Sequence, residues 1–81
     1  MRKLGNSYRA MVKAISVYTV FGELQIFENR VYFKKQEEAR VTFNNKCDLY
    51  RGNFPIKNLK SYEATLYGAD YSVIDKFTKV Y

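Results

Sequence analysis

The expected fold rests on residues 17–44, which read VYTVFGELQIFENRVYFKKQEEARVTFN. β-Branched and aromatic residues dominate this stretch, and short polar or glycine-containing groups interrupt it. This pattern is typical of strands joined by tight turns. We place the turns at Gly22-Glu23, Asn29-Arg30 and Gln36-Glu37-Glu38. Consecutive segments then pair as hairpins, which predicts a small antiparallel meander of about four strands.

Pairing these segments sorts their side chains onto two faces, because successive residues of a strand point to opposite sides. Thr19 then lies opposite Ile26, and Ile26 lies opposite Phe33. The first face is apolar and is expected to be the core wall, formed by Thr19, Phe21, Leu24, Ile26, Val31, Phe33, Val41 and Phe43. The second face carries one row of Tyr18, Phe27, Tyr32 and Thr42, a second row of Val20, Gln25, Lys34 and Arg40, and Arg30 and Asn44 at its edge.

The segment before this stretch has two interpretations. Apolar residues at positions 8, 11, 12 and 15 follow the spacing of an amphipathic helix over residues 6–16, with Asn6 or Ser7 as the cap. We favour this short N-terminal helix. The alternative is a strand that runs back through Met11, which the β-branched residues Ile15 and Val17 support.

The second half of the chain is expected to supply the helix that covers the core. Residues 44–55 are rich in turn formers and are expected to form loops, with at most a brief strand at Leu49 and Tyr50. Residues 57–68 fit both a strand and a helix, and we favour the strand. Asp70 can cap a C-terminal helix whose apolar stripe includes Ile74 and Phe77. The sequence therefore predicts an α+β fold, a meander packed against a C-terminal helix.

Composition places limits on the class of protein. The 81 residues suffice for one small domain spanning residues 1–81, and 47% hydrophobic residues with only four Gly and one Pro indicate a folded chain. The single cysteine, Cys47, excludes an internal disulfide and fits a reducing cytoplasm. The N-terminus has no apolar signal core and no stretch has membrane-spanning length, so we expect a cytoplasmic protein without a membrane partner.

The residue types argue against catalysis. Histidine is absent, which removes the commonest general base and most zinc sites. Cys47 lies between Lys46 and Asp48, whose effects on its pKa oppose each other. The glycines lack the spacing of a phosphate-binding loop. We therefore expect no enzymatic activity, no metal and no cofactor.

One enzymatic alternative is a small basic ribonuclease toxin, because such enzymes can use Lys, Arg and Tyr in place of histidine. Arg30, Tyr32, Lys34 and Arg40 would supply that set. Toxins of this class have a longer N-terminal helix packed on a sheet, whereas this chain has room for only one short helix before Val17.

Charge and aromatic content favour a binding function. The formal charge is +6, which favours polyanionic partners, and rings alternating with cations suit stacked bases and phosphates. We expect single-stranded nucleic acid, RNA before DNA, to bind at Tyr18, Phe27, Arg30, Tyr32, Lys34, Lys35 and Arg40.

The alternative function is a protein-interaction module, an inhibitor or adaptor that uses the same aromatic residues against a host or defence protein. An exposed Phe27 or an edge strand would also allow a homodimer. No motif places the chain in a family. In being short, rich in Tyr, Phe, Lys and Asn, and without Trp or His, it resembles accessory proteins of T-even-type phages, many of which bind host or defence proteins or RNA. This likeness is one of composition and implies no site.

Overall fold

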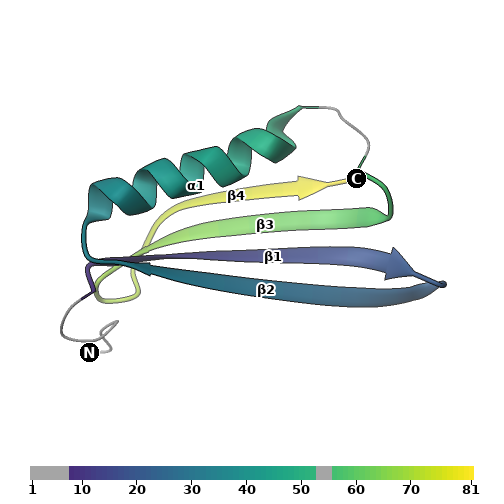
Figure 1. Ribbon diagram of the computed structural model, residues 1–81, viewed down its shortest axis with the longest axis horizontal. Helices are drawn as coiled ribbons and strands as arrows, with labels where there is room; N and C mark the ends of the chain where they lie inside the picture. Colours follow the sequence, from purple (N-terminus) through teal and green to yellow (C-terminus); the bar gives the residue numbers. More distant parts are fainter. Residues whose placement is uncertain (1–7, 53–55) are drawn as a thin grey trace.

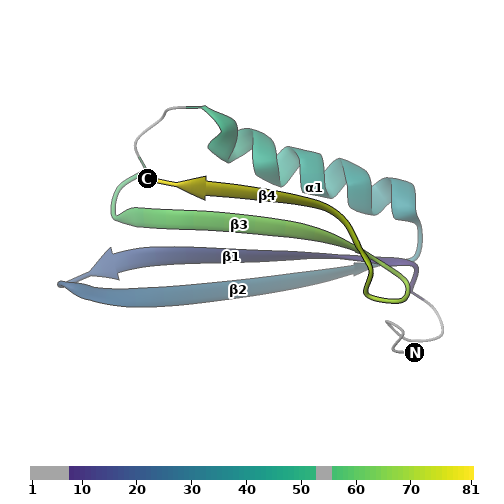
Figure 2. The same ribbon diagram turned by 180° about the vertical axis from the view of Figure 1, so that it is seen from behind.

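The computed structural model describes residues 8–52 and 56–81, and this part of the chain forms four strands and one helix (Figure 1). The strands form one layer, and the helix runs along it as a second layer, as the opposite views show (Figure 1 and Figure 2). In chain order the elements are β1 (Ala10–Val20), β2 (Glu23–Phe33), α1 (Gln36–Arg51), β3 (Leu59–Gly68) and β4 (Val73–Val80).

The sheet has the strand order β2-β1-β3-β4, and every neighbouring pair is antiparallel. β1 and β2 form one hairpin, β3 and β4 form another, and α1 connects them. The first hairpin turns at Phe21 and Gly22, which both have positive φ angles, 52° and 81°. Two-residue turns with positive φ at both positions match the twist of antiparallel strands. The central pairing of β1 with β3 joins the two hairpins into one sheet.

The two sides of the sheet differ in what lies against them. Ala10, Val12 and Ala14 belong to the same buried cluster as Ala39 and Phe43 of α1. Alternate residues of β1, starting at Ala10, therefore point toward the helix. Directly paired residues of neighbouring strands share a side, so the pairing extends this assignment across the sheet. We call the side against α1 the covered face and the other side the open face.

An apolar stripe with helical spacing explains α1. The stripe recurs at intervals of four, four and three residues, which places its members on one side of a helix. Its members are Ala39, Phe43, Cys47 and Tyr50. Glu37 and Glu38 lie in the first turn and Arg51 in the last, where their charges complement the helix dipole. Within the described ranges, no helix has the length and apolarity that crossing a membrane requires.

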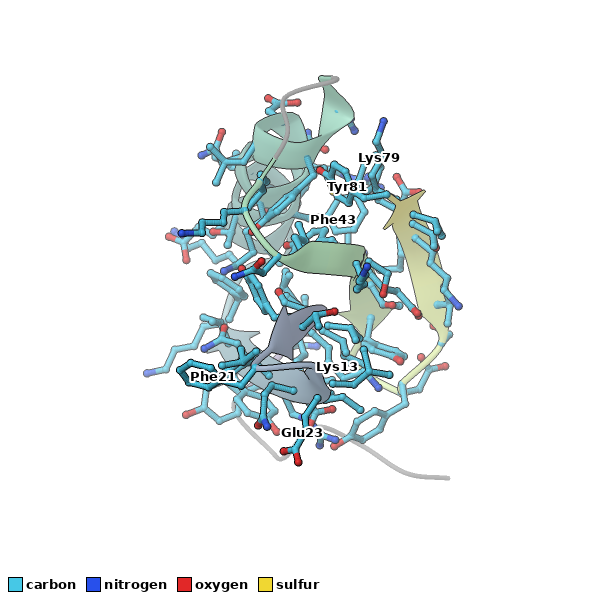
Figure 3. All side chains as sticks on the ribbon, turned by 90° about the vertical axis from the view of Figure 1, so that its right-hand side faces the viewer. Lys13, Phe21, Glu23, Phe43, Lys79 and Tyr81 are labelled. Atoms are coloured by element: carbon cyan, nitrogen blue, oxygen red, sulfur yellow. The ribbon has the colours of Figure 1, made fainter. Side chains whose placement is uncertain are left out.

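Small side chains on the covered face let α1 approach the sheet closely. Ala10 and Ala64 are 0% exposed beneath the helix, and Ala14 is nearly as buried. Phe43 lies between α1 and the sheet, whereas Lys13 lies on the opposite side (Figure 3). Full burial of a phenylalanine side chain contributes about 3 kcal/mol at most through the hydrophobic effect. The core is therefore built between α1 and the three strands β1, β3 and β4.

The predicted fold class is confirmed, because an antiparallel sheet of four strands packs against one helix in the described part of the chain. The predicted position of the helix is wrong. Residues 73–80 form β4, and the helix is α1 in the middle of the chain. Ile74 and Phe77, expected on a helical stripe, reach the edge of the core from a strand instead.

The predicted N-terminal helix is also wrong where the structure describes it, since β1 begins at Ala10. The alternative strand through Met11 is correct, and the candidate caps Asn6 and Ser7 lie outside the described residues. Along β1, small residues that point toward the core alternate with β-branched residues on the other side. This alternation explains the strand. The strand favoured for residues 57–68 is confirmed as β3.

The predicted turns and loop after the first hairpin are wrong. β2 runs without a break through Asn29 and Arg30, and the residues from Gln36 to Glu38 begin α1. α1 also replaces the expected strand from Val41 to Phe43 and most of the loop expected for residues 44–55, of which 53–55 lie outside the described residues. The helical stripe through Phe43 outweighs the local turn preference of the asparagines.

The first hairpin turns one residue earlier than predicted, which shifts the pairing by two. Thr19 pairs with Leu24, and Ile26 pairs with Val17. A shift of two leaves every side chain on the same side of the strand. Tyr18 and Phe27 therefore still share one face, as predicted.

The predicted core wall, however, is the wrong face. Thr19 and Ile26 lie on the open face, and Phe21 stands fully exposed at the hairpin tip. Of the expected wall, Phe43 is buried and Phe33 packs partly against the core. The helix covers the face of Tyr18 instead, because the small residues Ala10, Ala14 and Ala64 lie on that side.

Candidate functional site

The structure divides the seven predicted binding residues among both faces and a loop. Tyr18 and Phe27 lie on the covered face, and Arg30 and Tyr32 lie on the open face. Lys34 and Lys35 connect β2 to α1, and Arg40 lies on α1. The expected single row is therefore not formed. Tyr18 and Phe27 come together, with ring centroids 5.7 Å apart, while Tyr32 contacts Tyr8 in a tilted arrangement on the other side.

Both predicted arginines are engaged by carboxylates. Arg30 lies 3.3 Å from Glu28, which also lies 3.9 Å from Lys13. Arg40 donates a hydrogen bond of 2.7 Å to Asp75 of β4, and this bond lowers the pKa of the Asp75 carboxyl below its usual value. These guanidinium groups already have anionic partners, so neither is the first candidate for a phosphate contact.

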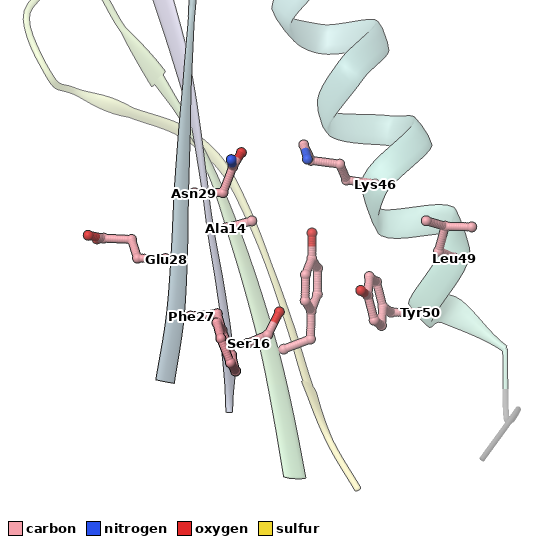
Figure 4. A pocket seen from close by; sticks show the side chains of 9 residues that line it. Ala14, Ser16, Phe27, Glu28, Asn29, Lys46, Leu49 and Tyr50 are labelled. Carbon is pink, nitrogen blue, oxygen red and sulfur yellow. The ribbon is translucent and has the colours of Figure 1, made fainter. Parts of the chain in front are cut away.

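A groove lies between α1 and the middle of β2, because α1 packs chiefly over β3 and β1. The groove encloses about 200 Å³. Phe27 and Asn29 of β2 face Lys46 and Tyr50 of α1 across it, while the Glu28 side chain points away (Figure 4). We call this feature the helix–β2 groove; its lining residues are Ala14, Ser16, Phe27, Glu28, Asn29, Lys46, Leu49, Tyr50 and Tyr62.

Aromatic rings form much of the groove wall. Tyr50 and Tyr62 stack with ring centroids 3.6 Å apart and an angle of 13° between their planes. Burial raises the pKa of both phenols, that of Tyr62 far above its usual range, so both rings are neutral at physiological pH. Phe27 is 58% exposed, in edge contact with Tyr18. The groove thus combines a fixed aromatic wall with an accessible ring.

The charge at the groove is cationic. Lys46 lines it, and Asp48, the nearest acid along α1, is paired with Arg51 at 2.8 Å. Lys34 and Lys35 continue the positive charge beyond the N-terminal end of α1. Among residues 8–52 and 56–81, no carboxylate forms an ion pair with these three lysines.

Comparison with known proteins adds no homologue. The chain matches no protein-family model, and neither a curated protein nor a solved structure shows significant similarity to it. A functional proposal therefore depends on the chemistry of the groove and of the sheet surfaces.

The sequence prediction missed the α1 side of the groove. Lys46, Leu49 and Tyr50 were assigned to a loop, although the helical spacing of Ala39, Phe43, Cys47 and Tyr50 contained the signal. Given that stripe, Lys46 and Leu49 fall on its border, where a residue can face the sheet edge. Asn29 was missed because a turn was predicted there.

The described residues contain no group of three or more His, Cys, Asp or Glu side chains that could hold a metal ion. Cys47 is fully buried on the inner side of α1, and this burial raises the pKa of its thiol, which disfavours the nucleophilic thiolate. The groove presents aromatic rings, hydrogen-bonding side chains and one cation.

Proposed function

We propose that the protein is a non-enzymatic binding protein for single-stranded nucleic acid, RNA in the first place, and that the helix–β2 groove holds the strand. The observation that carries this proposal is that the exposed Phe27 ring and Lys46 line the same aromatic groove, into which no carboxylate side chain of the lining points. Stacking on an aromatic side chain is worth about 1–3 kcal/mol per base and tolerates any base.

The groove supplies a complementary group for each part of a nucleotide. Phe27 offers a face to a base, and the Asn29 side chain can donate and accept hydrogen bonds at a base edge. Lys46 can neutralise the phosphate between two stacked bases, and Lys34 and Lys35 can contact phosphates beyond the N-terminal end of α1. RNA is favoured because proteins recognise RNA mainly through unpaired bases in single strands.

Three of the predicted residues lie outside the site under this proposal. Arg30 and Tyr32 lie on the open face, on the other side of the sheet from the groove, and Arg40 is held by Asp75. Tyr18, Phe27, Lys34 and Lys35 remain, joined by Lys46 and Asn29. The proposed site combines side chains of β1, β2 and α1 with the two lysines of the segment between β2 and α1.

Binding is tested by fluorescence anisotropy of a labelled random single-stranded RNA, and of the matching DNA, short enough to occupy one groove. The protein is titrated at about 50 mM and at about 200 mM salt. Contacts from Lys34, Lys35 and Lys46 predict a slope of about −2 in log affinity against log salt, at about −0.7 for each phosphate of a single strand. Absence of binding at the lower salt contradicts the proposal.

Neighbouring residues on opposite faces provide a matched pair of variants. Phe27→Ala is expected to weaken RNA binding roughly 5- to 150-fold, because it removes one stacking platform. Ile26→Ala removes a comparably exposed side chain from the open face of the same strand and should leave affinity unchanged. Equal losses in the two variants would contradict binding in the groove.

A second pair addresses the phosphate contact. Lys46→Ala should lower affinity and reduce the salt slope by about 0.7. Lys76→Ala removes the same charge from the open face, where Lys76 lies 3.0 Å from Glu63, and should change the slope much less. The difference between the two slopes measures the contribution of the groove separately from net charge.

The exposed tip of the first hairpin supports a second candidate, a protein-interaction module. Phe21 is fully exposed at a positive φ of 52°, a conformation that bulky residues rarely adopt. An exposed ring on a protruding hairpin is a suitable anchor for a pocket on a partner protein. Binding anchored there should respond weakly to salt and should be lost in Phe21→Ala, whereas RNA binding in the groove should be retained in that variant.

A further inference from the structure

The open face carries its charges in two adjacent rows that run across the strands. Arg30, Lys13 and Lys76 occupy one row, which we call the cation row. Glu28 and Glu63 occupy the next, which we call the acid row. Ion pairs of 3.9, 3.3 and 3.0 Å connect the two rows within the chain. These cations are balanced locally, so this face is not suited to a polyanion.

Apolar side chains lie on both sides of the two charged rows. Next to the cation row is an aromatic row of Tyr32, Met11 and Tyr67. Next to the acid row is an aliphatic row of Ile26, Val17 and Val80. Ile26 is 70% exposed and Val80 is 74% exposed. Exposed apolar side chains gathered on one side of a sheet usually mark a protein contact.

The order of the four rows is antisymmetric: aromatic, cationic, acidic, aliphatic. Consider a two-fold axis that runs across the strands, midway between the cation row and the acid row. Rotation about this axis exchanges the cation row with the acid row and the aromatic row with the aliphatic row. The cation row of one copy then meets the acid row of the other, and the aromatic row meets the aliphatic row. A face with this order is complementary to itself.

We infer that the open face packs against the open face of a second copy of this chain, forming a two-fold symmetric sandwich. This inference is independent of nucleic-acid binding, because the helix–β2 groove lies on the opposite side of the sheet. In the dimer Arg30 faces Glu28 of the other copy, and Tyr32 faces its Ile26. Sheets in sandwiches cross at about 30°, and the charged rows stay in register because they lie nearest to the axis.

The size of the face is sufficient for a specific dimer. Four strands about 4.8 Å apart and four rows about 6.7 Å apart give a flat area of about 500 Å² per copy. Two such surfaces bury about 1,000 Å² in total, about the smallest area expected of a specific interface. A recess of about 210 Å³ beside Met11, Lys13 and Tyr67 gives room for aliphatic side chains of the other copy.

Self-association is measured by sedimentation velocity of the full chain over a wide range of concentrations. The expected mass at high concentration is twice 9.6 kDa. Ile26→Lys places a charge in the aliphatic row and is expected to weaken association at least about tenfold. The matched control Phe27→Lys alters the next residue on the covered face and should keep the dimer. A monomer at every concentration overturns the inference.

A charge exchange between copies distinguishes this interface from any other self-association. Arg30→Glu and Glu28→Arg should each be monomeric, because like charges then meet across the axis. An equimolar mixture of the two variants should recover the doubled mass, because each cation again faces a carboxylate of the other copy. Circular dichroism of each variant verifies the fold. Failure of the mixture to dimerise while both variants are folded overturns the inference.

The test is separable from that of the proposed function. Phe27→Lys should lose RNA affinity and stay dimeric, whereas Ile26→Lys should become monomeric and retain affinity for a short RNA. Loss of both properties in both variants would contradict the assignment of separate faces.

Discussion

The two faces of the sheet differ in the side chains near the middle of the sheet, where the covered face carries alanines. The covered face places alanines at Ala10, Ala14 and Ala64 beneath α1. The open face carries Met11 and Ile15 at the neighbouring positions of β1. A helix can approach a sheet closely only where side chains are small, so that its own large residues fill the space between. The alanines therefore let α1 approach the covered face closely.

The faces also differ in how charge is arranged. In the buried cluster of the covered face there is no charged side chain, and the pair of Arg40 with Asp75 lies at its margin. The open face instead carries two complementary rows of charge in its centre. The covered face is packed against α1, whereas the open face has a charge pattern that a second surface can match.

The largest expected effect is on the covered face. Phe43→Ala should lower the free energy of unfolding by about 3–5 kcal/mol, because it leaves a cavity between α1 and the sheet. Val41→Ala on the solvent side of the same helix is the control, with an expected change within about 0.5 kcal/mol. Urea denaturation measures both. Similar losses in the two variants would mean that Phe43 is not the main contact of α1.

The buried phenol of Tyr62 should make stability fall at alkaline pH. Burial raises its pKa in the folded protein, while in the unfolded chain the phenol ionises near its usual value of about 10. The stabilisation linked to this raised pKa is therefore complete below about pH 10. It is lost as the pH rises toward the pKa of the folded state, by about 1.4 kcal/mol for each pH unit. Tyr62→Phe should remove this part of the loss of stability, measured by urea denaturation between about pH 8 and about pH 11.5. An unchanged pH dependence in Tyr62→Phe would contradict the burial of the phenol.

The smallest expected effect is on the open face. The Thr19 hydroxyl is buried and has no hydrogen-bond partner among the described residues. Thr19→Val should therefore raise the free energy of unfolding by about 1 kcal/mol, because an unpaired hydroxyl is replaced by a methyl group of the same size. The exposed Thr78, on the same face, supplies the control Thr78→Val, with little change expected. A loss of stability in Thr19→Val would mean that the hydroxyl is hydrogen-bonded in solution.

Local patterns predicted the first hairpin nearly correctly and the rest of its neighbourhood poorly. Gly22 identified the turn, and a one-residue error in its position changed the partners but not the faces. The prediction failed at Asn29, where residues common in turns lie within a long edge strand. Local preference was outweighed there by pairing with β1, which no short window of sequence contains.

The helix and the last strand show the same limit. Residues 36–51 contain asparagines and an aspartate that favour loops, and their helical stripe became decisive only because the alanines of the sheet accept it. Residues 73–80 have both a helical and a strand interpretation, and pairing with β3 decides between them. In the candidate site, alternation along the strands predicted that Tyr18 and Phe27 share a face. The contribution of Lys46 and Tyr50 could be predicted only with the correct assignment of α1.

By itself the sequence determined the α+β class, the positive charge, the lack of histidine and which residues of a strand share a face. These properties depend on composition and on alternation, which act over a few residues. Only the tertiary structure decided which face α1 covers, the pairing of Arg40 with Asp75 across 35 residues of chain, and the groove between α1 and β2. Alternation treats the two sides of a sheet as equivalent, and a choice between them requires a distant segment to pack against one of them.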